Sequence, residues 1–314
     1  MSELITMQRS AELAGTRAIG ADTFSRFIAY LDSSPKTVAT YTRALRQLAN
    51  YLAINGIRQP QREDIIAFRD ELKASGHKPT TIQSYITATK IFFTWTEQEG
   101  LYPNIAAHLK GAKLDRNHKK DYLTSSQVKE VLNSIDRSGE KGLRDYAMLF
   151  LMVTGGLRTI EVARADIGDL RTLGDNTVLY IQGKGREEKT EYIKISAPAE
   201  KAIRAYLKAR GEALESEPLF ISTSHNNQGQ RLTTRSISGI VKERLQNAGY
   251  DSSRLTAHSL RHTAVTLSLL AGRDLAEVQQ FARHANIATT MIYNHALDQA
   301  KNGCSEAITA AITG

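Results

Sequence analysis

Apolar residues recur at positions three and four apart through the N-terminal third of the chain. This spacing places them on one face of a helix, and it predicts helices over residues 24–31, 38–55, 62–75 and 80–100. Four helices of this kind, each with one apolar face, predict a four-helix bundle. Phe92, Phe93 and Trp95 fall on or beside the apolar face of the last helix, which favours the core over a base-stacking surface.

From residue 122 onward the pattern is mixed. The segment from Thr124 to Gln127 has the spacing of a capping box at the start of a helix, and the apolar run 143–153 predicts a helix buried on all sides. Alternating residues predict two strands joined by a turn, over 177–182 and 191–195. Helical patterns return over 199–209, 234–248, 258–271 and 275–282 and around Tyr293. The predicted fold class is therefore mainly α with a small β-sheet, an α+β fold.

Between these two regions, residues 111–121 carry no apolar stripe and are rich in lysine. The predicted organisation is an N-terminal extension, a helical domain, a basic linker, a mixed domain and a C-terminal tail, over 1–20, 21–110, 111–121, 122–296 and 297–314. Lys113, Lys119 and Lys120 of the linker either form a solvated hinge or lie along DNA that passes between the domains.

Composition narrows the class of protein. The chain has 314 residues, of which 41% are hydrophobic and 24% are charged, as in a soluble globular protein. No window approaches the length of a membrane-spanning helix, and the first residues lack the basic flank and apolar run of a leader, so we expect a cytoplasmic protein that does not bind membranes. Cys304 is the only cysteine, which excludes an intrachain disulfide.

The formal net charge is +8, and the surplus is concentrated in the N-terminal part of the chain. Residues 20–120 carry 15 basic and 9 acidic side chains, whereas residues 121–314 carry 24 and 22. A basic excess of this kind suits a surface that neutralises nucleic-acid phosphates, but a solvated basic face explains it equally well. Charge alone therefore leaves a nucleic-acid partner open.

Six side chains of the second domain form a set with a common chemistry: Arg158, Lys184, His258, Arg261, His284 and Tyr293. The two guanidiniums can hold an anionic phosphorus centre in a bidentate manner, the lysine and histidines can donate or accept protons, and the phenol is a nucleophile. Each residue alone has a structural explanation, such as an ion pair or core packing. Together they supply what is needed to cleave a phosphodiester without a metal.

The phenol needs help to react, because a free tyrosine has a pKa near ~10 and is almost wholly protonated at neutral pH. Arg158 and Arg261 can stabilise charge on the phosphate and on its transition state, and lysine at either position would lose the bidentate geometry. His258 precedes Arg261 by one helical turn, so the two side chains project from one face of the predicted helix.

The order of these motifs resembles the tyrosine recombinases, also called the phage integrase family. The shared motifs are Thr154-Gly155-Gly156-Leu157-Arg158, Gly183-Lys184-Gly185, His258-Ser259-Leu260-Arg261, and His284 followed nine residues later by Tyr293. The resemblance extends from about residue 21 to the C-terminus and is greatest to Xer-type recombinases and to the compact integrases of mobile elements.

Two positions depart from the family pattern. Ala282-Arg283 precedes His284 where the family often has Leu-Gly, and Gly155-Gly156 has one glycine more than the common form. Neither departure removes a reacting group.

The resemblance implies the reaction. Tyr293 would attack the scissile phosphate and form a 3′-phosphotyrosyl link, His258 would accept the phenol proton, and His284 would hydrogen-bond a non-bridging oxygen. Lys184 would be the general acid that protonates the departing 5′ oxygen. Lys189 shares the turn with Lys184 and is the alternative, but it lacks the flanking glycines.

The resemblance further implies that Glu161 orients the active-site groups. Glu161 follows Arg158 by three residues on the same helix face, so an ordinary surface ion pair is its alternative explanation.

The resemblance also implies partners. Double-stranded DNA recombination sites would be held between an N-terminal core-binding bundle and a C-terminal catalytic domain, and a homo-tetramer would exchange strands of two duplexes through a four-way junction. No metal, ATP or other cofactor is implied, since the phosphotyrosyl link conserves the bond energy. The tail, 297–314, would pack on a neighbouring protomer, with a frayed terminus as the alternative. The sequence leaves open whether an accessory DNA-bending protein is required.

We therefore expect a site-specific recombinase or integrase, and the residues leave three alternatives open. His258 and His262 have the i,i+4 spacing of a zinc site on a helix, although the Glu of the zinc-protease motif and an acidic third ligand are lacking. A DNA-binding protein without catalysis would need only the bundle and the basic linker. A type IB topoisomerase would share the phosphotyrosine chemistry and would relax DNA instead of joining two sites.

Overall fold

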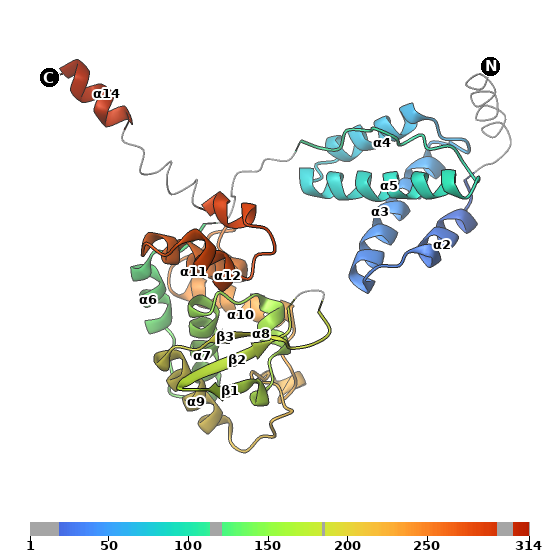
Figure 1. Cartoon of the computed structure of the whole chain (residues 1–314). Helices are drawn as coiled ribbons and strands as arrows, with labels where there is room; N and C mark the ends of the chain where they lie inside the picture. The colour runs from blue at the N-terminus through green and yellow to red at the C-terminus, as the bar shows by residue number, and fades with distance from the viewer. Residues whose placement is uncertain (1–18, 114–120, 184–185, 294–303, 314) are drawn as a thin grey trace. The chain divides into compact units, whose positions relative to one another are not determined.

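The computed structural model describes residues 19–113, 121–183, 186–293 and 304–313 (Figure 1). The chain divides into two compact units, Met1–Arg116 and Asn117–Gly314, and each has a hydrophobic core of its own. Lys119 and Lys120 of the predicted linker and Lys184 of the predicted site lie outside the described residues. In the described ranges, no helix is long and apolar enough to cross a bilayer.

The N-terminal unit contains the four helices that the sequence predicts: α2 (Ala21–Tyr30), α3 (Pro35–Ile54), α4 (Arg62–Ala74) and α5 (Pro79–Gln98). Proline begins both α3 and α5, where its missing N–H removes no helical hydrogen bond. The Ser34 hydroxyl accepts a hydrogen bond from the Thr37 N–H at the start of α3, and Asp64 accepts one from the Gln61 N–H at the start of α4.

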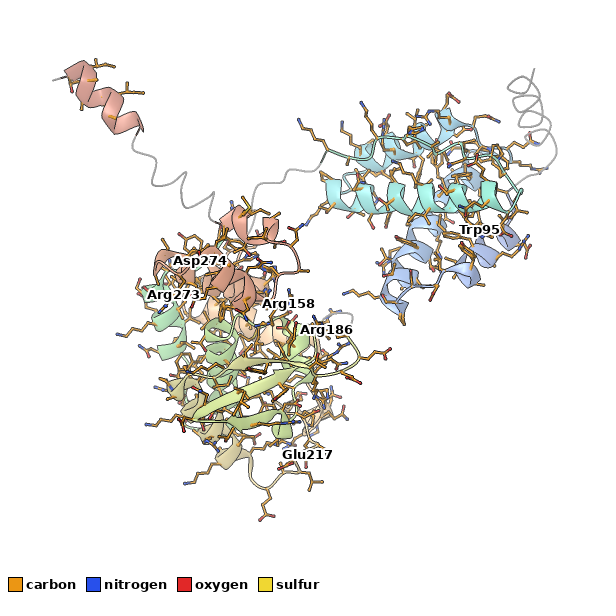
Figure 2. The ribbon with its side chains drawn as sticks, viewed as in Figure 1. Trp95, Arg158, Arg186, Glu217, Arg273 and Asp274 are labelled. Carbon is orange, nitrogen blue, oxygen red and sulfur yellow. The ribbon has the colours of Figure 1, made fainter. Side chains whose placement is uncertain are left out.

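Aromatic side chains of α2 and α5 fill the core of the N-terminal unit. The fully buried Phe92 ring stacks on Phe24 with centroids 4.8 Å apart, and it meets the Phe27 ring edge-on at 5.3 Å. Trp95, which Figure 2 labels, is buried beside Phe27 at a centroid distance of 5.4 Å. Phe93 is buried as well, so the prediction that these aromatic residues belong to the core is confirmed.

The C-terminal unit combines helices with one small sheet. Its elements are α6 (Ser125–Asn133), α7 (Glu140–Thr154), α8 (Thr159–Arg164), η1 (Ile167–Asp169), β1 (Leu170–Leu173), β2 (Asn176–Ile181), β3 (Glu191–Lys194), α9 (Ala197–Arg210), η2 (His225–Asn227), α10 (Thr234–Asn247), α11 (Ala257–Leu270), α12 (Leu275–Ala282) and α14 (Cys304–Thr313). The predicted fold class is confirmed. The capping box is confirmed too, since Thr124 and Gln127 exchange side-chain to main-chain hydrogen bonds at the start of α6.

The hydrophobic pattern missed strand β1. Three of its four residues are exposed, so no apolar alternation marks the strand. Residues 170–173 form a strand because they pair with β2. Leu170 lies opposite Leu179 of β2, and Leu179 lies opposite Ile193 of β3. The sheet is antiparallel with the order β1-β2-β3, and β2 is its central strand.

Helix packing in the C-terminal unit sets the place of the loops that carry the predicted site. Helix α7 packs along α9 and against α11, while α8 packs against β2 and α10. The run 143–153 of α7 was predicted to be buried on all sides, and most of it is buried, but Leu143, Tyr146 and Phe150 are only partly buried. Because α7 ends at a glycine turn and α8 begins directly after Arg158, this packing determines where Arg158 emerges.

We predict that Phe92→Ala lowers the free energy of unfolding of the N-terminal unit by about 3 to 5 kcal/mol, because it leaves a cavity among four aromatic rings. Trp95 is the only tryptophan of the chain, so its fluorescence during urea denaturation reports on this unit. Ile91→Ala on the same helix is the control. Its side chain is 37% exposed, and we expect a loss below about 1 kcal/mol. Equal losses in the two variants would contradict the prediction.

Candidate active site

Arg158 follows a turn of two glycines that ends α7. Gly156 has a φ of 57°, which favours glycine, and a Cβ at this position would lie 3.0 Å from the Phe281 ring of α12. A Cβ on Gly155 would lie 2.6 Å from the side chain of Ile193 in β3. The two glycines therefore let the turn lie close to both α12 and the sheet.

Two acceptors fix the guanidinium of Arg158, which is the N-cap residue of α8. Its Nη1 donates to Oε1 of Glu161 at 2.7 Å, and its Nη2 donates to the main-chain carbonyl of Arg283 at 3.2 Å. The backbone N–H of Arg158 donates to the other carboxylate oxygen of Glu161 at 2.8 Å. The side chain stays partly exposed, so a ligand can reach it.

Arg261 reaches the same place from α11. Its Nη1 donates to the carbonyl of Gly156 at 2.6 Å, and its Nη2 donates to the carbonyl of Ala282. Burial, followed by the positive charges of Arg158 and Arg283, lowers the pKa of Arg261 to about 9. Arg261 is therefore still cationic at neutral pH, and the structure brings the two predicted arginines together.

Glu161 is the buried counter-ion of this group. Its carboxylate lies 2.7 Å from Nη1 of Arg158 and 2.9 Å from Nη2 of Arg283, and it has no exposed side-chain surface. Burial acts to raise the pKa of Glu161, but the charge of Arg283 and the N–H and guanidinium of Arg158 lower it below its ordinary value. The Glu161 end of its ion pair with Arg158 is thus buried, whereas the Arg158 end stays partly exposed.

Tyr293 lies in the helical stretch 288–293 and packs in a small cluster with Val265, Val278 and Ala282. Its hydroxyl shares a hydrogen bond with Nδ1 of His262, and the two ring centroids lie 5.1 Å apart. The side chain is buried, and this burial raises the pKa of Tyr293 to about 12 although the charge of Arg261 acts to lower it. The phenol is therefore protonated in the DNA-free protein.

His258 and His262 lie side by side near the start of α11. Their rings meet edge-on at a centroid distance of 4.4 Å. His262 is buried and contacts the Tyr293 hydroxyl, whereas His258 is exposed. The three rings thus form a row from Tyr293 through His262 to His258.

His284 is the third histidine near the phenol ring. Its ring is nearly parallel to that of Tyr293 at a centroid distance of 6.4 Å, and its Nδ1 hydrogen-bonds Oγ1 of Thr290 at 2.9 Å. Burial, followed by the charges of Arg261, Arg158, Arg283 and His258, lowers the pKa of His284 to about 4. His284 is therefore neutral at neutral pH and can hydrogen-bond an anion without adding charge.

A cleft of about 650 Å³ opens beside these groups. Arg158, Arg186 and His284 line it, and Figure 2 labels the two arginines on the C-terminal unit. Gly183, the residue before Lys184, lines the cleft too. Lys184 itself lies outside the described residues, so its prediction stays a prediction.

Lys189, the alternative to Lys184, has partners elsewhere. Its Nζ lies 2.6 Å from Asp166 and 2.5 Å from Asp169, and it is absent from the lining of the cleft. A lysine held by two carboxylates is a structural cross-link, which agrees with the preference for Lys184.

The predicted linker contributes one described lysine, Lys113, whose side chain is exposed. Across the described ranges, no group of three or more His, Cys, Asp and Glu side chains is arranged to hold a metal ion. His258 and His262 of the zinc alternative thus have no third ligand in the part of the chain that the structure describes.

Two residues of the site were missed by the sequence analysis. His262 was named only in the zinc alternative, but its Nδ1 shares a hydrogen bond with the phenol hydroxyl. Arg283 was noted only as a departure from the family pattern, but its side chain pairs with Glu161. The signal for both was their position, since each directly adjoins a predicted site residue, Arg261 or His284.

Comparisons with known proteins identify the family of this chain. The phage integrase family matches residues 121–300, and the N-terminal SAM-like domain of phage integrases matches residues 23–100. The tyrosine recombinase XerC of Herpetosiphon aurantiacus is 34% identical over 283 residues, which cover 86% of this chain and 89% of the relative.

Solved structures share the fold. The XerH site-specific recombinase, bound to palindromic difH substrate as a post-cleavage complex, has a TM-score of 0.71 at 22% identity, covering 86% of this chain and 80% of the other. The Tn1549 transposon integrase in complex with transposon right end DNA has a TM-score of 0.70 at 18% identity, covering 87% and 93%. The chain therefore belongs to the phage integrase family and is a tyrosine-type site-specific recombinase.

The low pKa of His284 predicts a pH dependence of stability. The folded-state pKa of about 4 lies below the ordinary value of 6.5, so the unfolded chain takes up this proton first as the pH falls. The contribution of His284 to the free energy of unfolding is complete above about pH 6.5 and is lost progressively down to about pH 4. We expect a shallower loss over this range in His284→Gln, measured by urea denaturation and circular dichroism. Parallel curves for the two proteins would contradict the prediction.

Proposed function

We propose that this recombinase cuts and rejoins DNA with Tyr293 as the nucleophile and with Arg158 and Arg261 as the groups that hold the scissile phosphate. The observation that carries this proposal is that Arg158 lines the cleft, while the buried Arg261 lies close enough to Arg158 and to the buried Tyr293 for their charges to interact. His284 lines the same cleft. Two forked donors beside a nucleophile suit an in-line attack on a phosphodiester.

In the proposed step, the Tyr293 oxygen attacks phosphorus and the bond between phosphorus and the 5′ oxygen breaks. The phenol proton passes to a histidine, and Lys184 donates a proton to the departing 5′ oxygen. The products are a 3′-phosphotyrosyl link and a free 5′ hydroxyl. Attack by the 5′ hydroxyl of a partner duplex reverses the step, so no ATP, metal or other cofactor is required.

We assign proton transfer to His262 and His258, and anion binding to His284. In the proposed resting state, Nδ1 of His262 accepts a hydrogen bond from the phenol hydroxyl. His258 contacts the His262 ring and is exposed, so it can pass the proton on to solvent. His284 is neutral and would hydrogen-bond a non-bridging oxygen. Because the pKa of Tyr293 is about 12, the phenol would remain unreactive until phosphate and both arginines meet at the cleft.

The proposed substrate is double-stranded DNA that carries recombination sites. The basic surplus of residues 20–120 supports phosphate binding by the N-terminal unit as a core-binding domain, and the exposed Lys113 at its end fits a path along the DNA backbone. Lys119 and Lys120 belong to the same proposed contact. The division into core-binding, linker and catalytic parts is part of this proposal.

The proposed assembly is a homo-tetramer on two duplexes. Ile308 and Ile312 of α14 are 60% and 77% exposed, which supports packing of the tail on a neighbouring protomer. Recombination by the purified protein alone would remove the need for an accessory DNA-bending protein. Relaxation of supercoils without exchange between sites would favour a topoisomerase.

The first test is covalent capture of DNA in a chelator. A binding site is first selected from random-sequence DNA with the wild-type protein. A duplex carrying this site is nicked close to the scissile phosphate, so that cleavage releases a short strand that diffuses away and the covalent adduct accumulates. We expect an adduct at Tyr293 that resists denaturant, no adduct with Tyr293→Phe, and an unchanged adduct with Tyr192→Phe, which alters an exposed tyrosine. An adduct on another residue would refute the assignment of the nucleophile.

In the same assay, Arg261→Lys should slow adduct formation by about 10²- to 10³-fold, since lysine cannot reproduce the two parallel hydrogen bonds. The measurement is the single-turnover rate at saturating DNA. A rate within about threefold of the wild type would contradict a role in the transition state.

The general acid can be tested by changing the leaving group. We expect Lys184→Ala to be slow on ordinary DNA and close to wild type on DNA with sulfur at the 5′ bridging position, because a thiolate leaves without a proton. Arg261→Lys should not be rescued by sulfur. If Lys189→Ala were rescued and Lys184→Ala were not, the general acid would be Lys189.

A further inference from the structure

Arg283 occupies an unusual backbone position. It is the C-cap residue of α12, with a φ of 53° in the left-handed region that side chains other than glycine rarely adopt. A residue with a Cβ persists at such a position when contacts of its side chain compensate for the backbone conformation.

The side chain of Arg283 makes these contacts. It is 8% exposed, and its Nη2 donates to the carbonyl of Gly156 at 3.0 Å and to Oε2 of Glu161 at 2.9 Å. Its Nη1 donates to the carbonyl of Phe281 at 2.7 Å. One guanidinium thus joins the end of α12, the glycine turn after α7 and the first turn of α8.

These three segments are the ones that hold the phosphate-binding arginines. Arg158 donates to Glu161 and to the carbonyl of Arg283, while Arg261 donates to the carbonyls of Gly156 and Ala282. Every acceptor in this set belongs to a residue that Arg283 contacts, to Arg283 itself or to its direct neighbour. A shift of the Arg283 side chain would therefore move the partners of both arginines.

We propose that Arg283 is a positioning residue, which clamps Glu161 and the glycine turn to the end of α12 and so fixes the guanidiniums of Arg158 and Arg261 for catalysis. This inference rests on the proposed function of those two arginines. Arg283 borders the cleft, but its side chain is only 8% exposed, and its Nη1 and Nη2 donate to carbonyls and a carboxylate. Arg283 therefore acts through its neighbours.

Charge gives the clamp a second effect. The positive charge of Arg283 lowers the pKa of His284, as do the charges of Arg261, Arg158 and His258. Removing that charge should make protonation of His284 easier. The fall in cleavage rate at low pH, the acid limb of the pH profile, should therefore begin at a higher pH. A side chain that only stabilises the fold would lower the rate without moving this limb.

The test uses the full chain and the nicked duplex described above. Arg283→Gly relieves the backbone conformation and removes the clamp, so we expect folding and DNA affinity to persist while the adduct rate at saturating DNA falls by about 10- to 100-fold. Its acid limb should lie at higher pH than in the wild type. Arg283→Lys keeps the charge, so we expect the wild-type limb with an intermediate rate.

Arg273→Gly is the matched control. Arg273 precedes α12, is 66% exposed and is labelled in Figure 2, so its loss removes the same charge without a clamp. We expect its rate and its pH profile to equal those of the wild type. Should Arg283→Gly fail to fold, Arg283→Lys supplies the comparison, and a wild-type rate in that variant would overturn the proposal.

Coupling to Glu161 gives an independent readout. If Arg283 acts through Glu161, the variant with both Arg283→Gly and Glu161→Gln should be little slower than the slower single variant. Fully multiplicative effects would overturn the clamp, as would an Arg283→Gly variant that cleaves at the wild-type rate or loses only DNA affinity. Absence of a Tyr293 adduct in the wild type would instead refute the proposed function.

Discussion

One buried carboxylate, that of Glu161, faces the guanidiniums of Arg158 and Arg283, and a third guanidinium from Arg261 lies close by. Like charges at short range in a poorly solvated pocket repel strongly, so this group is stable only if neighbouring dipoles compensate. The carbonyls of Gly156, Ala282 and Arg283 supply this compensation, since each accepts a hydrogen bond from a guanidinium. Donors held in this way are ready for an anion before it binds.

The same field acts on the groups that transfer protons. Burial raises the pKa of Tyr293 to about 12 and lowers that of His284 to about 4, so both side chains are neutral in the DNA-free protein. The arginines remain the main charges at the cleft. A bound phosphate would offset part of their charge, which links the electrostatics of the site to the presence of substrate.

Close backbone approach makes this arrangement sterically feasible. The second glycine of the pair Gly155-Gly156 has a left-handed backbone and lies against Phe281, so a side chain there would push the turn away from α12. A Cβ on the first glycine, Gly155, would lie 2.6 Å from the Ile193 side chain, so both positions of the pair favour glycine. Arg283 also has a left-handed backbone, but it keeps a side chain, which joins the end of α12 to the glycine turn and to α8.

Much of this protein followed from its residues alone. Periodic apolar spacing predicted the helices of the N-terminal unit, most helices of the C-terminal unit, and strands β2 and β3. The order of the six polar side chains along the sequence indicated the class of chemistry. Strand β1 and the contacts of His262 and Arg283 were decided only by tertiary structure. Their partners, Leu179, Tyr293 and Glu161, come from other segments of the chain, so no local pattern could reveal which groups would meet.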